Sequence, residues 1–447
     1  MDTLRIAMVA PPFFELPPTG YGGIELVVAD LIDTLVERGH EVTLIGAGRN
    51  GTRAQFRRTY AEPQHARLGE PLPEAVHAAA AAQILDRLDV DVVHDHTLLG
   101  PLQARGRVAP TVVTVHGPVV GEPAVYYRLV GGTTHLVAIS HAQRSFAPGL
   151  NWVGTVHNAI DPKRCTFRAV KEDWVLFLGR CTADKGMHLA IEIAQAAGRP
   201  IKLAAKCQDP VERAYFDAEI RPRLGDGVEW LGEITGQEKQ EALAAARCLL
   251  FPLQWEEPFG MVLLEALASG TPVVTMPRGA VPEIVTDGVT GFVREHLEDL
   301  PAAVDAAGDI DPHRCLQEVL DRFTPQIMAA RYERVYRRVL DRAAGVTRRA
   351  TAGAIRRRLA VAKDAVTPLP GKALGTPASR AVGTTPPGAA GTPPPGAAGT
   401  PPPGAAGTSP PGAVGTPPPG AVGWSLPGAG AVGTPRPGPV SAYPPAS

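Results

Sequence analysis

The sequence predicts an α/β fold of two doubly wound domains, followed by a C-terminal tail that lacks a packed core. From residue 1 to about 340, short β-branched runs alternate with longer helical stretches, which is the pattern of parallel sheets built from βα units. At 447 residues the chain is too long for one ordinary domain, and 44% of its residues are hydrophobic, enough for sizeable cores. From about Thr367 the composition changes abruptly to proline, glycine and alanine.

The first domain is predicted over residues 1–165 and the second over residues 166–322. The boundary falls in the polar connection from Asp161 to Asp173, after which WVLFLG restarts the strand pattern. Strands of the first domain are expected at 4–10, 41–46, 91–94, 111–115, 135–139 and 153–156. Strands of the second domain are expected at 174–178, 201–205, 228–231, 248–251 and 272–275.

Three segments are predicted after the second domain: a crossover helix over 323–345, a basic linker over 346–366 and a disordered tail over 367–447. Octapeptides such as GTPPPGAA repeat in the tail, and they lack the large apolar side chains that offset the entropy cost of ordering. The basic stretch from Arg342 to Lys363 is interpreted first as a solvated linker. The alternative is a weak peripheral contact with an anionic membrane.

Charge and cysteine content narrow the classes of function. With 44 basic and 45 acidic residues the formal charge is −1, which gives no reason to expect a nucleic-acid partner. The five cysteines form no CxxC pair, so neither a zinc site nor a disulfide framework is expected. No apolar run reaches the ~18 residues of a membrane span, and the N-terminus lacks a signal-peptide pattern. We therefore expect a cytoplasmic protein, at most peripheral at the inner face of the membrane, with a small-molecule partner.

Two acids stand eight residues apart in the phrase EEPFGMVLLEALASGTPVV. Pro258 is expected in the first helical turn, which places Glu257 at the mouth of the helix and Glu265 about two turns inside it. The helix mouth offers free N–H groups to a phosphate or a polar sugar edge. Glu265 has apolar neighbours, so its carboxylate is costly to bury unless ligand hydroxyls hydrogen-bond to it. The alternative is that Glu265 is a surface acid.

Two cations follow a strand in the phrase FLGRCTADKGMH. Arg180 and Lys185 stand between the strand that ends at Gly179 and the next helix. Such a loop lies at the carboxyl edge of a parallel sheet, where an arginine fork and a lysine point charge can hold a diphosphate. Two solvated loop cations are the alternative interpretation.

Glycines and a histidine mark the loops of the first domain. Gly22 and Gly23 precede an apolar helix, where they would let backbone amides approach a phosphate, although a tight turn alone could explain them. His116 ends the strand TVVTVHG, at the sheet edge where ligands bind, although a structural role is the alternative. His94 and His96 have the spacing of metal ligands, but no third ligand is evident.

These phrases together resemble the family 4 glycosyltransferases over roughly residues 3–340. The phrase from Glu257 to Glu265 resembles the EX7E motif of that family, and the phrase from Arg180 to Gly186 resembles its GRxxxxKG-like motif. The resemblance implies the GT-B fold, in which two Rossmann-like domains enclose the active site in the cleft between them.

The resemblance also implies a role for each matching residue. Glu257 would lie beside the donor hexose, and it is preferred to Glu256 because the family's acid directly precedes x-Phe-Gly. Glu265 would bind the ribose. The catalytic residues implied are Glu257, His116, Arg180 and Lys185. The donor-binding residues implied are Gly22, Gly23, Glu265, Gly260, Lys206, Gly232 and Glu233, with Ser140 and Asn158 as further cleft candidates.

The expected reaction is transfer of a hexosyl group from a UDP- or GDP-sugar to a hydroxyl acceptor, in glycan, glycolipid or small-molecule glycoside synthesis. Cations would stabilise the leaving diphosphate, and Asp89-Val90-Asp91 precedes a strand and points away from the chemistry, so no metal or other cofactor is expected. The resemblance implies front-face retention of the anomeric configuration. The alternatives are a GT-B epimerase or phosphorylase, or a non-catalytic sensor of nucleotide sugars.

Overall fold

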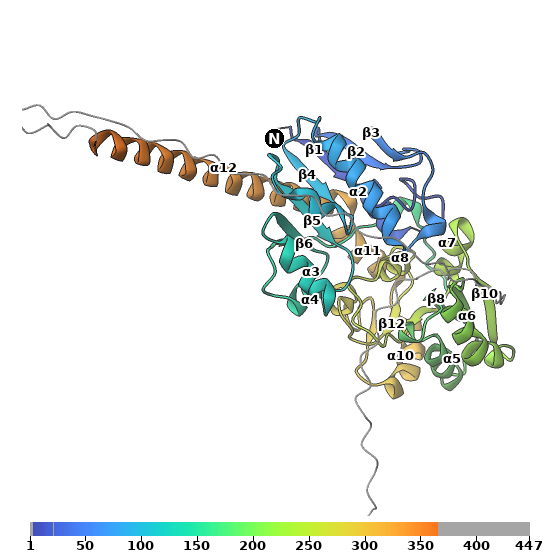
Figure 1. Ribbon diagram of the computed structural model, residues 1–447. Helices are drawn as coiled ribbons and strands as arrows, with labels where there is room; N and C mark the ends of the chain where they lie inside the picture. Colours follow the sequence, from blue (N-terminus) through green and yellow to red (C-terminus); the bar gives the residue numbers. More distant parts are fainter. Residues whose placement is uncertain (1–2, 21, 365–447) are drawn as a thin grey trace, which may run out of the picture. The chain divides into compact units, whose positions relative to one another are not determined.

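A computed structural model describes residues 3–20 and 22–364, with the backbone alone for 345–364. The described chain contains two sheets, of seven strands in the order β3-β2-β1-β4-β5-β6-β7 and of six in the order β10-β9-β8-β11-β12-β13. Neighbouring strands of both sheets pair in parallel (Figure 1). The predicted α/β fold with two parallel sheets is confirmed. The predicted tail at 367–447 lies outside the described residues.

The first sheet places its most buried strands in the centre. Strand β5 is buried at every position, because a central parallel strand is covered on both faces. The strands are β1 (Arg5–Val9), β2 (Glu41–Ala47), β3 (Gln55–Tyr60), β4 (Val92–Asp95), β5 (Thr111–Val115), β6 (Thr134–Ala138) and β7 (Trp152–Thr155). The helices of this domain are α1 (Gly23–Glu37), α2 (Pro71–Leu85), α3 (Glu122–Val130) and α4 (His141–Phe146).

The second sheet has its own apolar core, in which Phe177 and Phe251 pack with their ring centroids 5.8 Å apart. Its strands are β8 (Val175–Arg180), β9 (Ile201–Lys206), β10 (Val228–Gly232), β11 (Cys248–Phe251), β12 (Val273–Thr275) and β13 (Gly291–Val293). Its helices are α5 (Met187–Ala196), α6 (Pro210–Tyr215), α7 (Gly236–Ala245), α8 (Met261–Ala268), α9 (Val281–Ile284), α10 (Leu300–Ala306) and α11 (Pro312–Arg322).

Two strands of the structure were not predicted, β3 and β13, and both lie at sheet edges. Strand β3 has the sequence QFRRTY, and most of its residues are exposed or half-buried. Strand β13 has only three residues, GFV. Edge strands pair on one side only and are often short or charged, so they lack the buried β-branched run that identifies a central strand.

Helix α12 (Pro325–Asp364) follows the second domain in sequence but packs on the first. Tyr332 and Tyr336 are almost completely buried there. Glu333 accepts hydrogen bonds from Arg38 at 2.5 and 2.9 Å and from His40 at 3.1 Å, and the Arg38 guanidinium lowers the pKa of Glu333 to about 2.

The helix continues past the predicted end at residue 345 and through most of the predicted linker. The sequence from 343 to 364 contains no proline and is rich in alanine and arginine, which favour helix. In the described part of the chain, no helix combines the length and apolar character that crossing a membrane requires.

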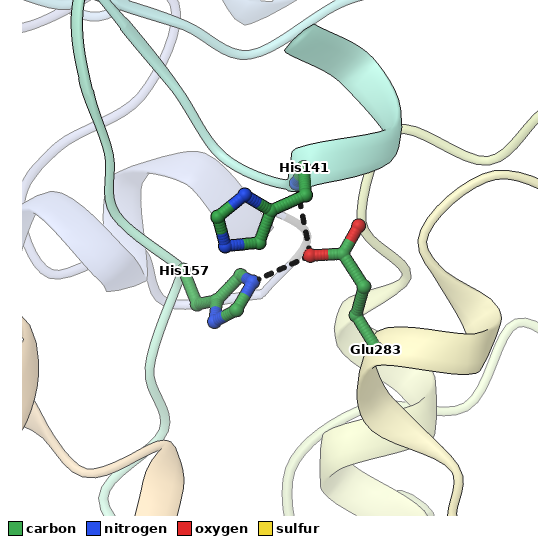
Figure 2. Close-up of side chains that lie close together, drawn as sticks. All are labelled: His141, His157 and Glu283. Carbon is green, nitrogen blue, oxygen red and sulfur yellow. Dashed lines mark hydrogen bonds and ion pairs between the residues drawn. The ribbon is translucent and has the colours of Figure 1, made fainter. Parts of the chain in front are cut away.

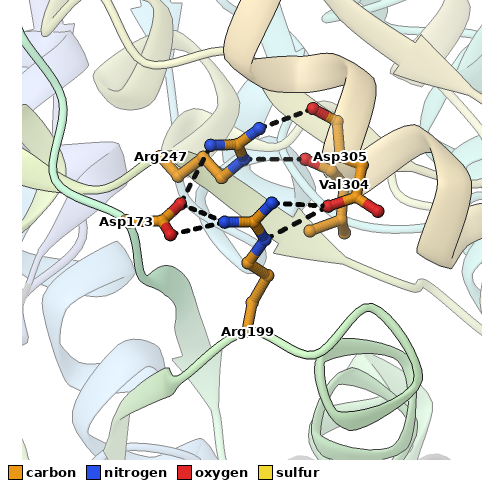
Figure 3. A network of polar contacts seen from close by, with 5 residues as sticks. All are labelled: Asp173, Arg199, Arg247, Val304 and Asp305. Carbon is orange, nitrogen blue, oxygen red and sulfur yellow. Dashed lines mark hydrogen bonds and ion pairs between the residues drawn. The ribbon is translucent and has the colours of Figure 1, made fainter.

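A charged network fixes the amino ends of the second sheet (Figure 3). Asp173, Arg199 and Arg247 stand just before β8, β9 and β11. Arg247 donates to the backbone carbonyls of Val304 at 3.1 Å and Asp305 at 2.6 Å, and also pairs with Asp173 at 2.9 Å. Arg199 bridges the carboxylates of Asp173 and Asp305. We call Asp173, Arg199, Arg247 and Asp305 the amino-edge network.

Candidate functional site

A hollow of about 610 Å³ lies at the carboxyl ends of the second sheet, a size that suits a small-molecule ligand. Residues of the first domain also line it, among them Gly22 and Gly23. Cations that line the hollow are Arg164, Arg180, Lys185, Lys206 and Lys239, and acids that line it are Glu233, Glu257 and Glu265.

The two acids of the EX7E-like phrase both reach the hollow, but the helix begins later than predicted. Helix α8 starts at Met261, so Pro258 and Glu257 lie in the loop before it. Gly260 precedes the helix with φ 92°, a left-handed conformation from which the helix cannot extend backwards. The carboxylate of Glu265 is only 13% exposed, which argues against a simple surface acid.

Each acid of the phrase is paired with a lysine. Lys185 Nζ lies 2.5 Å from Glu257 Oε2, and the indole of Trp255 donates to the same oxygen at 3.2 Å. The ammonium of Lys185 also lies 4.4 Å from the Trp255 ring centroid, within cation–π range. Lys239 Nζ lies 2.6 Å from Glu265 Oε1. Both lysines are therefore held in position by the acids beside them.

Arg180 is positioned in the same way. Its Nε and Nη2 donate to Glu212 Oε1 at 3.0 and 2.7 Å. The other carboxylate oxygen of Glu212 accepts from the backbone N–H of Gln208 and Asp209, as part of the capping box at the start of α6. We call Lys185–Glu257, Lys239–Glu265 and Arg180–Glu212 the carboxyl-edge pairs.

The backbone of Glu257 is fixed by a turn that the sequence analysis did not single out. Ala280 N–H donates to Glu257 O at 2.9 Å, and Gly279 N–H donates to the Glu256 carboxylate at 2.6 Å. Gly279 has φ +56°, and a Cβ there would lie 2.1 Å from Glu257 O. Only glycine can therefore stand at this position without moving Glu257.

The first domain meets this region at two points. Gly22 is the N-cap of α1, and a Cβ on Gly23 would lie 3.9 Å from Met261 Cγ, so the glycine pair faces the start of α8. Ser140 Oγ donates to the carbonyl of Pro258 at 2.8 Å. The loop that carries Glu257 is therefore contacted from both domains.

The structure does not place His116 among the residues that line the hollow. Its Nε2 lies 2.9 Å from His96 Nδ1, and burial lowers the pKa of His116 to about 4. The His94 ring contacts the His96 ring in a tilted arrangement, with the centroids 4.1 Å apart, and hydrogen-bonds to Thr114 at 2.7 Å and to Tyr336 at 2.8 Å. This chain of buried side chains connects His116 to helix α12. Contact between His116 and a donor sugar remains a prediction.

The other predicted residues divide into two groups. Gly260, Lys206 and Glu233 line the hollow, whereas Gly232, Asn158 and Ser140 do not. Asp89 and Asp91 both form ion pairs with Arg5, and none of these three residues lines the hollow.

One group in the described part of the chain has the composition of a metal site: His141, His157 and Glu283 (Figure 2). Glu283 already accepts from the backbone N–H of His141 at 2.9 Å and of Ala142 at 2.7 Å. Arg331 donates to His157 Nδ1 at 3.2 Å, so the ring proton lies on Nε2, which donates to Glu283 at 2.8 Å. Neither ring nitrogen of His157 has a lone pair left for a metal, and we interpret the group as a contact between domains.

Sequence reasoning missed Glu212, Lys239, Trp255 and Gly279. The spacing of Asp209 and Glu212 is that of a capping box and could have located Glu212. Lys239 contacts Glu265 from helix α7, and Trp255 stands two residues before Glu257 in the same loop. No local sequence pattern marks either residue.

Family models of glycosyltransferases match both domains of the chain. A family model described as "Glycosyltransferase Family 4" matches residues 21–164, and one described as "Glycosyl transferases group 1" matches residues 172–308. The chain is 27% identical over 401 residues to an alpha-maltose-1-phosphate synthase of Mycobacterium tuberculosis, covering 75% of this chain and 100% of that one.

Two solved structures show a similar fold. One is a glycosyltransferase involved in avilamycin A biosynthesis, with a TM-score of 0.58 and 28% identity, covering 76% of this chain and 98% of that one. The other is an Anabaena protein in complex with UDP and glucose, with a TM-score of 0.59 and 18% identity, covering 74% and 98%. The second likeness concerns the fold alone.

Proposed function

This chain belongs to family 4 of the glycosyltransferases, and on that premise we propose that it transfers a hexosyl group from a UDP- or GDP-sugar to a hydroxyl acceptor. The product would be a glycan, a glycolipid or a small-molecule glycoside. We further propose that the transfer retains the anomeric configuration and requires no metal. The observation that carries the proposal is the hollow in which cations from strand ends and the two acids Glu257 and Glu265 meet.

The donor would lie along the hollow with its diphosphate at the ends of β8 and β9. Arg180, Lys185 and Lys206 line this part, and guanidinium and ammonium groups are the natural partners of phosphate oxygens. Glu265 would accept hydrogen bonds from the two ribose hydroxyls. Glu257 would contact the hexose, because it lies beside Lys185 and therefore close to the transferred carbon.

The chemical step requires that negative charge be stabilised on the departing diphosphate. The bond between the anomeric carbon and the phosphate oxygen breaks, and the acceptor oxygen forms its bond on the same face. The acceptor proton passes to an oxygen of the departing phosphate. Glu257 is bound by Lys185 and Trp255, which makes it a poor nucleophile and supports transfer without a glycosyl-enzyme intermediate.

Product analysis tests the proposal. The full chain would be incubated with UDP- and GDP-hexoses and a panel of hydroxyl acceptors, and the anomeric configuration of the product read by NMR. We expect a retained configuration, and undiminished turnover in the presence of a chelator. An inverted product would contradict retention, and activity that is lost with chelator and restored by a divalent metal would contradict metal independence.

Two neighbouring acids provide a matched control. Glu257→Gln should abolish transfer, whereas Glu256→Gln should retain most of it, because Glu256 does not line the hollow and the amide oxygen of glutamine can still accept from the Gly279 N–H. Isomerised donor without acceptor would indicate an epimerase, and a requirement for inorganic phosphate would indicate a phosphorylase. Donor binding without any turnover would indicate a sensor.

A further inference from the structure

Four arginines gather on one segment of helix α12, apart from the hollow described above. Arg334, Arg337, Arg338 and Arg342 line a second depression of about 530 Å³, together with one acid, Asp341. Within the described residues none of the four guanidinium groups forms an ion pair. In contrast, Arg38 on the same domain is paired with a buried glutamate.

One hydrogen-bond donor of this group is left without an acceptor. The Nη2 atom of Arg337 is buried, and no described residue accepts a hydrogen bond from it. An unsatisfied buried donor costs about 1–3 kcal/mol, so the site is incomplete without an anion or another acceptor. Arg338 donates to the carbonyl of Val153 on β7, which fixes the arginine group against the first domain.

Positive charge is concentrated along one face of the helix. Arg331, Arg334, Arg338 and Arg342 are spaced by three or four residues, which places them on one side. Burial, followed by the neighbouring charges of Arg334 and Arg322, lowers the pKa of Arg331. In the sequence, basic residues then recur at every seventh position after Arg342: Arg349, Arg356 and Lys363.

The sequence argues against an occupant from the same chain. Residues 365–447 contain no aspartate or glutamate, so the tail has no acidic side chain to offer the arginines. Four guanidinium groups on neighbouring turns of one helix also suit an extended anionic surface better than a single small anion. Guanidinium forks bind phosphate oxygens in particular.

We propose that Arg334, Arg337, Arg338 and Arg342 bind the phosphates of anionic lipid headgroups. Because α12 packs on the first domain, this contact holds that domain at a membrane surface. The contact is independent of the donor hollow, so its failure would leave the proposed glycosyl transfer untouched.

Vesicle binding by the full chain tests the proposal. Co-sedimentation would be measured with phosphatidylcholine vesicles and with vesicles that also contain phosphatidylglycerol, at physiological ionic strength. We expect binding to the anionic vesicles only. Arg334→Gln/Arg342→Gln should weaken it by about 25-fold, since each arginine near an anionic surface contributes about fivefold in affinity.

The matched control is Arg57→Gln/Arg58→Gln, which removes two exposed arginines of β3 and the same net charge. The control should bind the vesicles as the unaltered chain does, and both variants should retain its melting temperature. Equal weakening by both double variants would overturn the proposal. The absence of binding to anionic vesicles would also overturn the proposal. This holds even if inorganic pyrophosphate binds the unaltered chain and does not bind Arg334→Gln/Arg342→Gln, because the arginines would then bind a free phosphate compound and not a lipid headgroup.

Discussion

Two sets of ion pairs lie at opposite ends of the strands of the second sheet, the amino-edge network at the amino ends and the carboxyl-edge pairs at the carboxyl ends. They differ in what surrounds them. The amino-edge network closes on itself and on the backbone carbonyls of Val304 and Asp305 (Figure 3). All members of the carboxyl-edge pairs except Glu212 instead line a hollow of about 610 Å³. Ion pairing therefore does not identify binding residues by itself. Position at the carboxyl ends of parallel strands, together with an adjoining hollow, distinguishes the charges that we propose to bind ligand from the charges that hold the fold.

Among the cations of the carboxyl edge, removal of Lys185 should have the largest effect. Lys185→Ala should lower kcat by about 100- to 1,000-fold, because the cation stabilises charge that develops on the leaving phosphate. Steady-state kinetics would measure it, with Lys163→Ala, an exposed lysine, as control. A kcat within about threefold of the unaltered enzyme would contradict the assignment.

Glu265→Gln should act mainly on donor binding. A hydrogen bond to a charged group contributes about 1.5–3 kcal/mol, so KM for the donor should rise by roughly 10- to 100-fold. The effect on kcat should be smaller, because the ribose lies away from the reacting carbon. Glu238→Gln on α7 is the control, since Glu238 is exposed and does not line the hollow. An unchanged KM would remove Glu265 from the donor site.

Arg247→Ala should show the opposite pattern at the amino edge. Loss of its bonds to two backbone carbonyls should lower the free energy of unfolding by about 1–3 kcal/mol, as measured by denaturant titration. The kcat and KM of the folded enzyme should remain unchanged. A raised donor KM with unaltered stability would show that the two edges are not divided as we describe.

The loss of stability at acid pH should arise from a buried histidine of the first domain and not from either set of ion pairs. Burial lowers the pKa of His94 to about 3, with His116 adding to the effect, so the folded state disfavours the proton that the unfolded state takes up below pH 6.5. The free energy of unfolding should therefore decrease as the pH is lowered. Between pH 7 and pH 5.5 this histidine should account for a decrease of about 1 kcal/mol. Denaturant unfolding at both pH values should show a smaller loss in His94→Gln. An equal loss in the variant would place the acid response elsewhere.

Truncation after residue 366 should have the smallest effect. The predicted repeat tail lies outside the described residues and outside the residues that the family models match, so kcat and KM should be unchanged in the same assay. Loss of transfer on truncation would place the C-terminal boundary of the enzyme beyond residue 366.

Most of the central strands and the main charges of the hollow could be predicted from the sequence. Buried parallel strands carry continuous apolar runs, and Arg180, Lys185, Glu257 and Glu265 lie in phrases with a local pattern. The edge strands β3 and β13 could not be found in this way, since neither carries such a run.

Contacts between distant elements were also beyond the sequence. Lys239 is 26 residues from Glu265, its partner, and Glu212 is 32 residues from Arg180. The start of α8 depends on the left-handed conformation of Gly260, whereas proline at position 258 suggested an earlier start. Tertiary structure therefore decided which charges pair and where the helix begins.

Calorimetric titration with UDP, GDP and their hexose conjugates tests the central claim most directly. One nucleotide sugar should bind the unaltered chain and Arg247→Ala with equal affinity, and should bind Glu265→Gln at least about tenfold more weakly. Equal affinity for Glu265→Gln, or no binding of any nucleotide sugar to the unaltered chain, would contradict it.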